Sequence, residues 1–130
     1  MLKATMSVLL ILALGGVAMA RDQFEGKWTV TVTPDADADA AGEKEFEDAF
    51  EFKGIKFSSK FFKELGFEPV EYETDTRGVI AASFTAVFKS DEIGTAKWTG
   101  FTTGQEIQGE LVRTRPDGTV LRFTYKGTKE

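Results

Sequence analysis

Apolar and polar residues alternate with a period of two along most of this sequence. In the segment 24–33, for example, Trp28, Val30 and Val32 alternate with polar side chains. This rhythm is typical of a β-strand with one buried and one solvated face. The same alternation predicts seven further strands, over residues 44–53, 55–57, 70–74, 79–89, 95–102, 107–111 and 119–126. The sequence therefore predicts an all-β protein.

Turn signals between the strands predict how they are connected. The segments 75–78 and 115–118 are typical of hairpin turns, because Pro116 presets the backbone and Gly118 adopts positive φ freely. Eight strands joined in this way predict an antiparallel up-and-down eight-stranded β-barrel, since closure removes exposed edges. A β-sandwich is the alternative, because alternation does not distinguish one closed sheet from two packed sheets.

One segment, 58–66, departs from the alternation and predicts a short helix between strands three and four. Ser58 and Ser59 supply a cap, and Gly66 a stop. The helix is too apolar to face solvent, so we expect it to pack across one end of the barrel, as a fixed plug or as a mobile lid over a ligand entrance. The apolar residues of this segment are Phe61, Phe62 and Leu65, and Phe67 follows it directly.

Residues 1–20 have the features of a signal peptide. Lys3 is followed by an apolar run over 8–14, which is too short for a membrane span of about 20 residues, and by the cleavage pattern Ala18-Met19-Ala20. We therefore expect one exported domain, 21–130, in a periplasm or outside the cell. The net charge of −5 argues against nucleic acid as a partner, and the absence of cysteine means that burial alone must stabilise the fold.

The sequence contains neither histidine nor cysteine, which excludes most catalytic arrangements. Ser-His-Asp triads, cysteine nucleophiles and imidazole metal ligands all need one of these residues. Asp35, Asp37 and Asp39 resemble the start of a calcium loop, but Ala40 and Phe46 stand where an EF-hand needs Gly and Glu. We expect a solvated acidic loop over 35–42, no metal, no cofactor and no enzymatic activity.

Asp48 is the one residue that keeps an enzyme hypothesis open. The alternation places it on the inner face with Phe46, Phe50 and Phe52. Such a carboxyl has either a raised pKa or a partner, and would anchor a ligand or act as an acid. The other interpretation is a β-bulge that turns Asp48 outward, or a position at the barrel mouth. The candidate partners are Arg77, Arg113 and Tyr125.

The predicted inner face combines many aromatic residues with small ones. Twelve phenylalanines are present, and Ala82, Ala86, Ala96, Gly100 and Gly109 stand opposite them. This pattern fits a close-packed interior and equally an apolar pocket for one hydrophobic molecule. If a pocket exists, we expect its lining to be Phe50, Phe52, Phe57, Phe84, Phe88, Trp98 and Tyr125.

The segment Phe24-Glu25-Gly26-Lys27-Trp28 resembles the Gly-x-Trp signature of the first strand in lipocalins and related calycin barrels. The resemblance implies that Gly26 and Trp28 mark one closed barrel end, and that a basic residue of the last strand, Arg122, packs across the tryptophan. The chain is also similar to small lipocalin-like proteins exported by bacteria. Avidins share a similar first strand, but the lack of any Asn argues against biotin recognition of their type.

Two functions therefore stand as expectations. The first is a noncatalytic, exported, lipocalin-like barrel that binds a small hydrophobic molecule. The alternative is a periplasmic protein-binding module, such as a protease inhibitor or an assembly partner, with a filled core. An internal cavity or a solid interior distinguishes them, and the sequence leaves the oligomeric state open.

Overall fold

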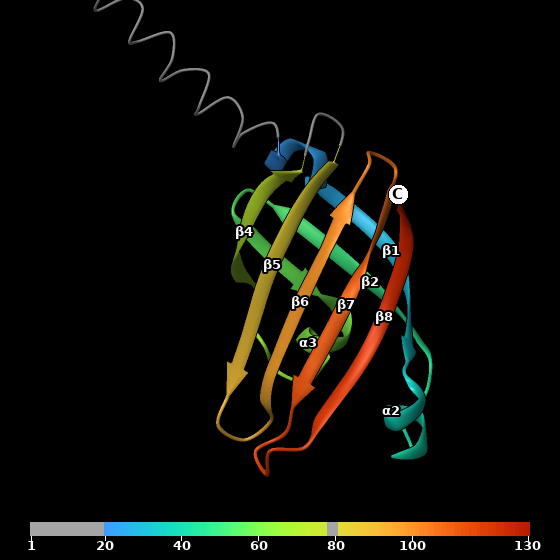
Figure 1. Ribbon diagram of the computed structural model, residues 1–130. Coiled ribbons are helices and arrows are strands. Elements are labelled where there is room, and N and C mark those ends of the chain that lie inside the picture. Colours follow the sequence, from blue (N-terminus) through green and yellow to red (C-terminus); the bar gives the residue numbers. More distant parts are fainter. Residues whose placement is uncertain (1–19, 78–80) are drawn as a thin grey trace, which may run out of the picture.

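The computed structural model describes residues 20–77 and 81–130 and shows a closed antiparallel barrel with the strands in chain order (Figure 1). β1 pairs with both β2 and β8, which closes the sheet. This confirms the predicted eight-stranded up-and-down barrel and excludes the sandwich. The strands are β1 (Gly26–Pro34), β2 (Phe46–Lys53), β3 (Lys56–Ser59), β4 (Val70–Arg77), β5 (Ala81–Ser90), β6 (Gly94–Thr102), β7 (Glu106–Thr114) and β8 (Val120–Lys129).

Two segments lie outside the described residues. They are 1–19, which make up nearly all of the predicted signal peptide, and 78–80, which end one predicted turn and begin the predicted fifth strand. Within residues 20–77 and 81–130, no helix has the length and hydropathy needed to cross a membrane.

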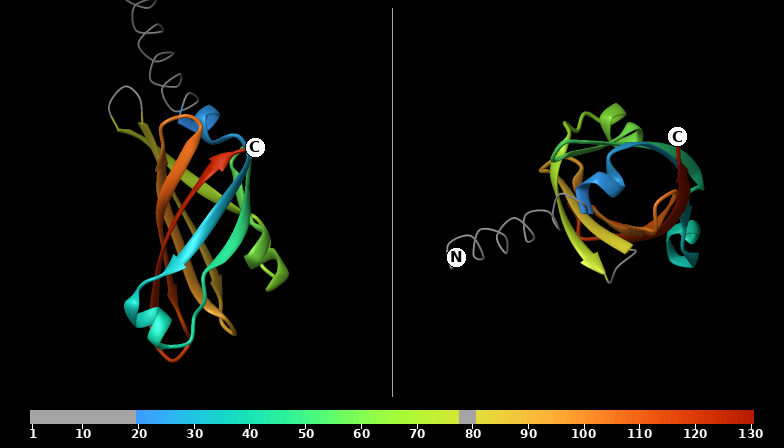
Figure 2. Two further views of the ribbon diagram at one scale, coloured as in Figure 1. Left: turned by 90° about the vertical axis from the view of Figure 1, so that its right-hand side faces the viewer. Right: turned by 90° about the horizontal axis from the view of Figure 1, so that it is seen from above.

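Two short helical segments differ from the prediction. The expected acidic loop contains α2 (Ala36–Ala40), whose first turn is capped by Asp35 through a 2.8 Å bond from the Ala38 N–H. Alanine favours helix and aspartate favours the N-cap, so this short segment folds locally. Residues 20–24 form a helical turn where a strand was expected to begin, and this turn lies over one end of the barrel (Figure 2).

The predicted helix between strands three and four is α3 (Lys60–Glu64), capped by Ser59. It packs against the side of the barrel, and the prediction that it covers an end is wrong (Figure 2). The reason is the short ladder between β3 and β4, which contains only the pairs of Lys56 with Glu71 and of Phe57 with Val70. α3 therefore fills a part of the wall that the strands leave incomplete.

Inward-facing glycines make room for large side chains, as the sequence suggested. A Cβ on Gly100 would collide with the hydroxyl of Tyr125, and a Cβ on Gly109 would collide with the backbone of Thr99. With this space available, the Tyr125 hydroxyl donates to the Thr99 carbonyl at 3.0 Å. Small and large residues thus interlock across β6, β7 and β8.

Candidate functional site

The structure brings together all seven residues predicted to line a pocket. None of these side chains is more than 3% exposed. They pack against one another: the Phe50 ring lies 4.8 Å from Trp98, 5.0 Å from Phe57 and 5.3 Å from Tyr125 between centroids, mostly edge to face. The seven rings are therefore buried against one another inside the barrel.

Three further aromatic side chains, which the sequence did not assign to this set, extend the packing. Phe24, from the helical turn, lies 5.1 Å from Phe52 and 5.2 Å from Phe84. Tyr72 packs 5.0 Å from Phe52, and burial is the main cause that raises its pKa to about 12. The third is Phe62 of α3, which reaches into the barrel and stacks on Phe88 at 5.3 Å.

One polar atom of this interior has no partner. The indole N–H of Trp98 is buried, and it forms no hydrogen bond with any described residue. The Tyr125 hydroxyl, by contrast, is hydrogen-bonded, and burial raises its pKa well above 10. Most buried polar groups are paired, so the Trp98 N–H is an exception in an otherwise apolar packing.

Asp48 lies on the inner side of β2, opposite Val30 in a regular ladder, with 4% of its surface exposed. Its carboxylate accepts three hydrogen bonds. These come from the Ser59 hydroxyl at 2.5 Å, the Ala49 N–H at 2.8 Å and the Phe61 N–H at 3.0 Å. Two of the three donors belong to the start of α3, so Asp48 holds this helix against β2 through hydrogen bonds.

The partners expected for Asp48 are placed elsewhere. The Arg113 guanidinium lies over the rings of Phe61 and Phe62 at 5.8 and 5.6 Å, and Tyr125 bonds to Thr99. The side chain of Arg77 is outside the described part of the chain. Burial is the main cause that raises the pKa of Asp48, and the three hydrogen bonds oppose it. Since its oxygens are occupied and enclosed, Asp48 serves the structure of the wall.

Where Gly26 and Trp28 begin β1, a different cation from the expected one lies over the tryptophan. The Trp28 N–H donates to the Phe24 carbonyl at 2.8 Å, and the Lys129 ammonium lies 5.3 Å from the Trp28 ring centroid. Gly26 leaves space for this lysine, since a Cβ there would touch its Cε. The prediction that Arg122 packs across Trp28 is wrong. Lys129 is paired with Trp28, whereas the exposed Arg122 lies about 23 Å away at about 3.3 Å per residue of β8.

This assignment predicts unequal effects of two substitutions on β8. Lys129→Ala is expected to lower the free energy of unfolding by about 1 kcal/mol, because it removes a cation and an aliphatic stem from the indole face. Arg122→Ala, the matched control, is expected to change it by less than about 0.5 kcal/mol. Urea denaturation followed by tryptophan fluorescence measures both. A larger effect of the Arg122 change would contradict the assignment.

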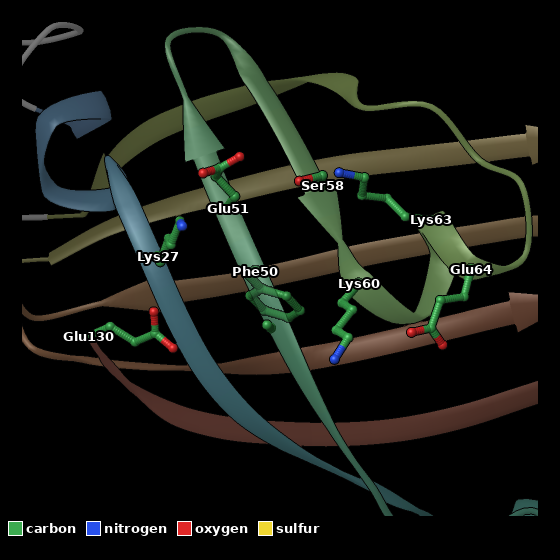
Figure 3. A pocket seen from close by; sticks show the side chains of 9 residues that line it. Lys27, Phe50, Glu51, Ser58, Lys60, Lys63, Glu64 and Glu130 are labelled. Carbon is green, nitrogen blue, oxygen red and sulfur yellow. The ribbon is translucent and has the colours of Figure 1, made fainter.

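The first outer hollow lies beside α3 and has a volume of about 510 Å³ (Figure 3). Lysines and carboxylates surround it in equal number, from β1, β2, α3 and the C-terminal residue. No ion pair joins any two of them within 4 Å among the described residues. The balance of charge gives this hollow no preference for an anion or a cation. Its charged residues are Lys27, Lys60, Lys63, Glu51, Glu64 and Glu130.

Three neighbouring hollows on another part of the outer surface share one residue, Phe101. The largest has a volume of about 670 Å³ and crosses β6, β7, β8 and β1. The other two, of about 480 and 270 Å³, adjoin the same phenylalanine. Polar side chains of the strands form most of the lining, among them Thr31, Gln108 and Lys126. The sequence analysis did not select this face, although Phe101 is an aromatic residue at an outward position of its strand.

Acidic side chains do not gather into a metal site in the part of the chain that is described. Asp35 caps α2, and Asp37 and Asp39 follow in its first turn. Comparison of the sequence with models of known protein families and with curated proteins finds no match.

Proposed function

We propose that this chain is a noncatalytic, exported binding module that uses its outer surface, with the barrel as a filled and rigid scaffold. The observation that carries this proposal is the mutual packing of the seven inner aromatic side chains, each at most 3% exposed. Protein interiors packed in this way leave little room for a ligand. Of the two functions expected from the sequence, the geometry supports the filled core of the second, and the proposal keeps this core without restricting the partner of the outer surface to a protein.

Two features of the barrel support the same proposal. Phe24 closes one end, and Phe62 fills the incomplete part of the wall. Both side chains are 0–1% exposed. Export remains a proposal that rests on the sequence of residues 1–20, and Phe24 follows the proposed cleavage position by four residues.

Native mass spectrometry of the protein purified gently from its source tests the proposal. We expect the bare polypeptide mass before and after organic extraction, and no fluorescence gain from an apolar dye such as Nile red. A discrete extra mass that organic extraction removes would contradict the proposal, because it would place a small molecule inside the barrel.

The buried Trp98 N–H favours one second candidate, the binding of a small apolar molecule inside the barrel. A ligand with a carbonyl or ether oxygen would satisfy this donor, which has no partner among the described residues. Phe62 would have to move with α3 to make room, since it lies 5.8 Å from Trp98. The same mass measurement decides between the two candidates.

A further inference from the structure

Phe101 is the exception among the aromatic residues of this chain. Its side chain is 39% exposed, whereas the other fifteen aromatic side chains are buried or partly buried. It projects outward from β6, at the meeting point of the three hollows. The strand is paired on both sides, with Ser83 and Gln108 directly beside Phe101, so the ring is held on a regular sheet.

The neighbours of Phe101 are hydrogen-bonding side chains. One row across the sheet continues from Gln108 to Lys126 and then to Thr31. The side chains of Gln108 and Lys126 form no hydrogen bond with any other described residue. Glu106 and Glu110 add acceptors on the same strand as Gln108. One apolar ring is therefore surrounded by unused donors and acceptors.

This combination fits a sugar ring better than a peptide. The centre of a protein interface is mainly apolar, with polar residues at its rim. Among the residues that line these hollows, Phe101 is the exposed apolar side chain, whereas Ile107, Tyr125 and Phe84 are buried. Most of the other lining residues are polar, which matches a pyranose with one C–H face and a rim of hydroxyl groups. The two larger hollows, of about 480 and 670 Å³, fall in the size range of small-ligand sites.

The charge of the face selects among sugars. Three carboxylates, of Glu45, Glu106 and Glu110, line the hollows, against one ammonium, of Lys126. Glu45 already accepts a bond from Thr33 at 3.0 Å, which leaves the other two to meet a ligand. Anionic saccharides and phosphates would be repelled. The face therefore suits a neutral saccharide.

We propose that the outer face around Phe101 binds a neutral saccharide, whose ring stacks on Phe101 and whose hydroxyl groups bond to Gln108, Glu106 and Lys126. This rests on the proposed function, because it names the ligand class of the outer surface. Binding at a shallow face of this kind is expected to be weak, with a Kd on the order of 1 mM or somewhat tighter.

Titration of the ¹⁵N-labelled protein with cellohexaose, chitohexaose and maltohexaose, each to about 5 mM, tests the proposal by NMR. At least one sugar is expected to shift the amide signals of residues 99–103 and 106–110 in a saturable way. Phe101→Ala is expected to weaken binding about tenfold or more, and Gln108→Ala severalfold. Val120→Ala is the matched control, since Val120 is 46% exposed and lies on β8 outside these hollows.

The proposal is overturned if none of the three sugars shifts these signals, or if binding survives the Phe101→Ala change. A protein partner that depends on Phe101 in place of a sugar would overturn the saccharide assignment and leave the surface-binding proposal standing. Failure of the surface-binding proposal is recognised separately, by an apolar molecule bound inside the barrel.

Discussion

Replacing Phe50 with alanine is expected to lower the free energy of unfolding by about 4 kcal/mol, the largest effect that we predict for one substitution. Phe50 is 1% exposed, and its ring is within 6.4 Å, between centroids, of Phe52, Phe57, Trp98 and Tyr125. Its removal forfeits the burial of the ring and leaves a cavity that the neighbouring rings fill only in part. Guanidinium denaturation followed by circular dichroism measures the loss.

If the core is filled as proposed, the same variant is expected to acquire a new binding site for small apolar molecules. A dry cavity lined by aromatic rings binds small apolar molecules such as benzene. We therefore expect benzene to raise the melting temperature of Phe50→Ala and to leave that of the wild type unchanged. Val120→Ala controls for the loss of an apolar side chain at an exposed site. A loss below about 1.5 kcal/mol for Phe50→Ala would show that the interior is loosely packed.

Replacing Asp48 with alanine is expected to cost about 3 kcal/mol. The change leaves the Ser59 hydroxyl and the N–H groups of Ala49 and Phe61 without their common acceptor. A buried donor without a partner has given up its hydrogen bonds to water and gains none in exchange, which lowers the free energy of unfolding. Because two of these donors begin α3, hydrogen exchange is expected to speed up at Phe61 and Phe62 before the rest of the barrel is affected. Unchanged exchange there would contradict the role of Asp48 in holding α3.

Asp48→Asn separates the charge of this side chain from its hydrogen bonds. The folded protein raises the pKa of Asp48 above its ordinary value of 3.8, so protonation stabilises the fold. This contribution is fully present below about pH 3.8 and is lost as the pH rises through the raised pKa. We therefore expect the stability of the wild type, relative to Asp48→Asn, to fall with rising pH and then to level off. Denaturation curves between about pH 3 and 8 measure it, and a relative gain with rising pH would contradict the direction of the shift.

The strands could be predicted because a half-buried sheet imposes a period of two on the sequence, and turn residues mark its interruptions. α2 was missed because the segment 36–40 has no apolar stripe, and only the cap at Asp35 signalled a helix. The end of β8 was also missed. Lys129 lay beyond the predicted strand. Its position over Trp28 is set by the register of β1 with β8, and this register depends on pairing between distant segments of the chain.

For the candidate sites too, the sequence predicted the features set within one strand and missed the contacts between distant segments. Alternation placed Asp48 and the seven aromatic residues on the inner face, because the side of the sheet to which a side chain points depends only on its position in the strand. It did not show that Ser59 and Phe61 would meet Asp48, since this contact joins β2 to a helix eleven or more residues later. A signal for Phe101 was present. Phe101 alternates with the inward-facing residues Trp98 and Thr102 in the same way as Thr99 and Thr103, so its position along the strand already predicts an outward side chain.

The pairing of β1 with β8 has a consequence for the time at which this protein folds. The two strands come from opposite ends of the chain, and their ladder joins residues about a hundred positions apart, such as Trp28 and Lys129. A chain that emerges with its N-terminus first lacks the last partner of β1 until β8 has followed. Since long loops close slowly and early strands gain little without their neighbours, we expect the barrel to close only after β8 is available to pair with β1. Until β8 pairs with β1, the edge of β1 that faces away from β2 has no partner strand.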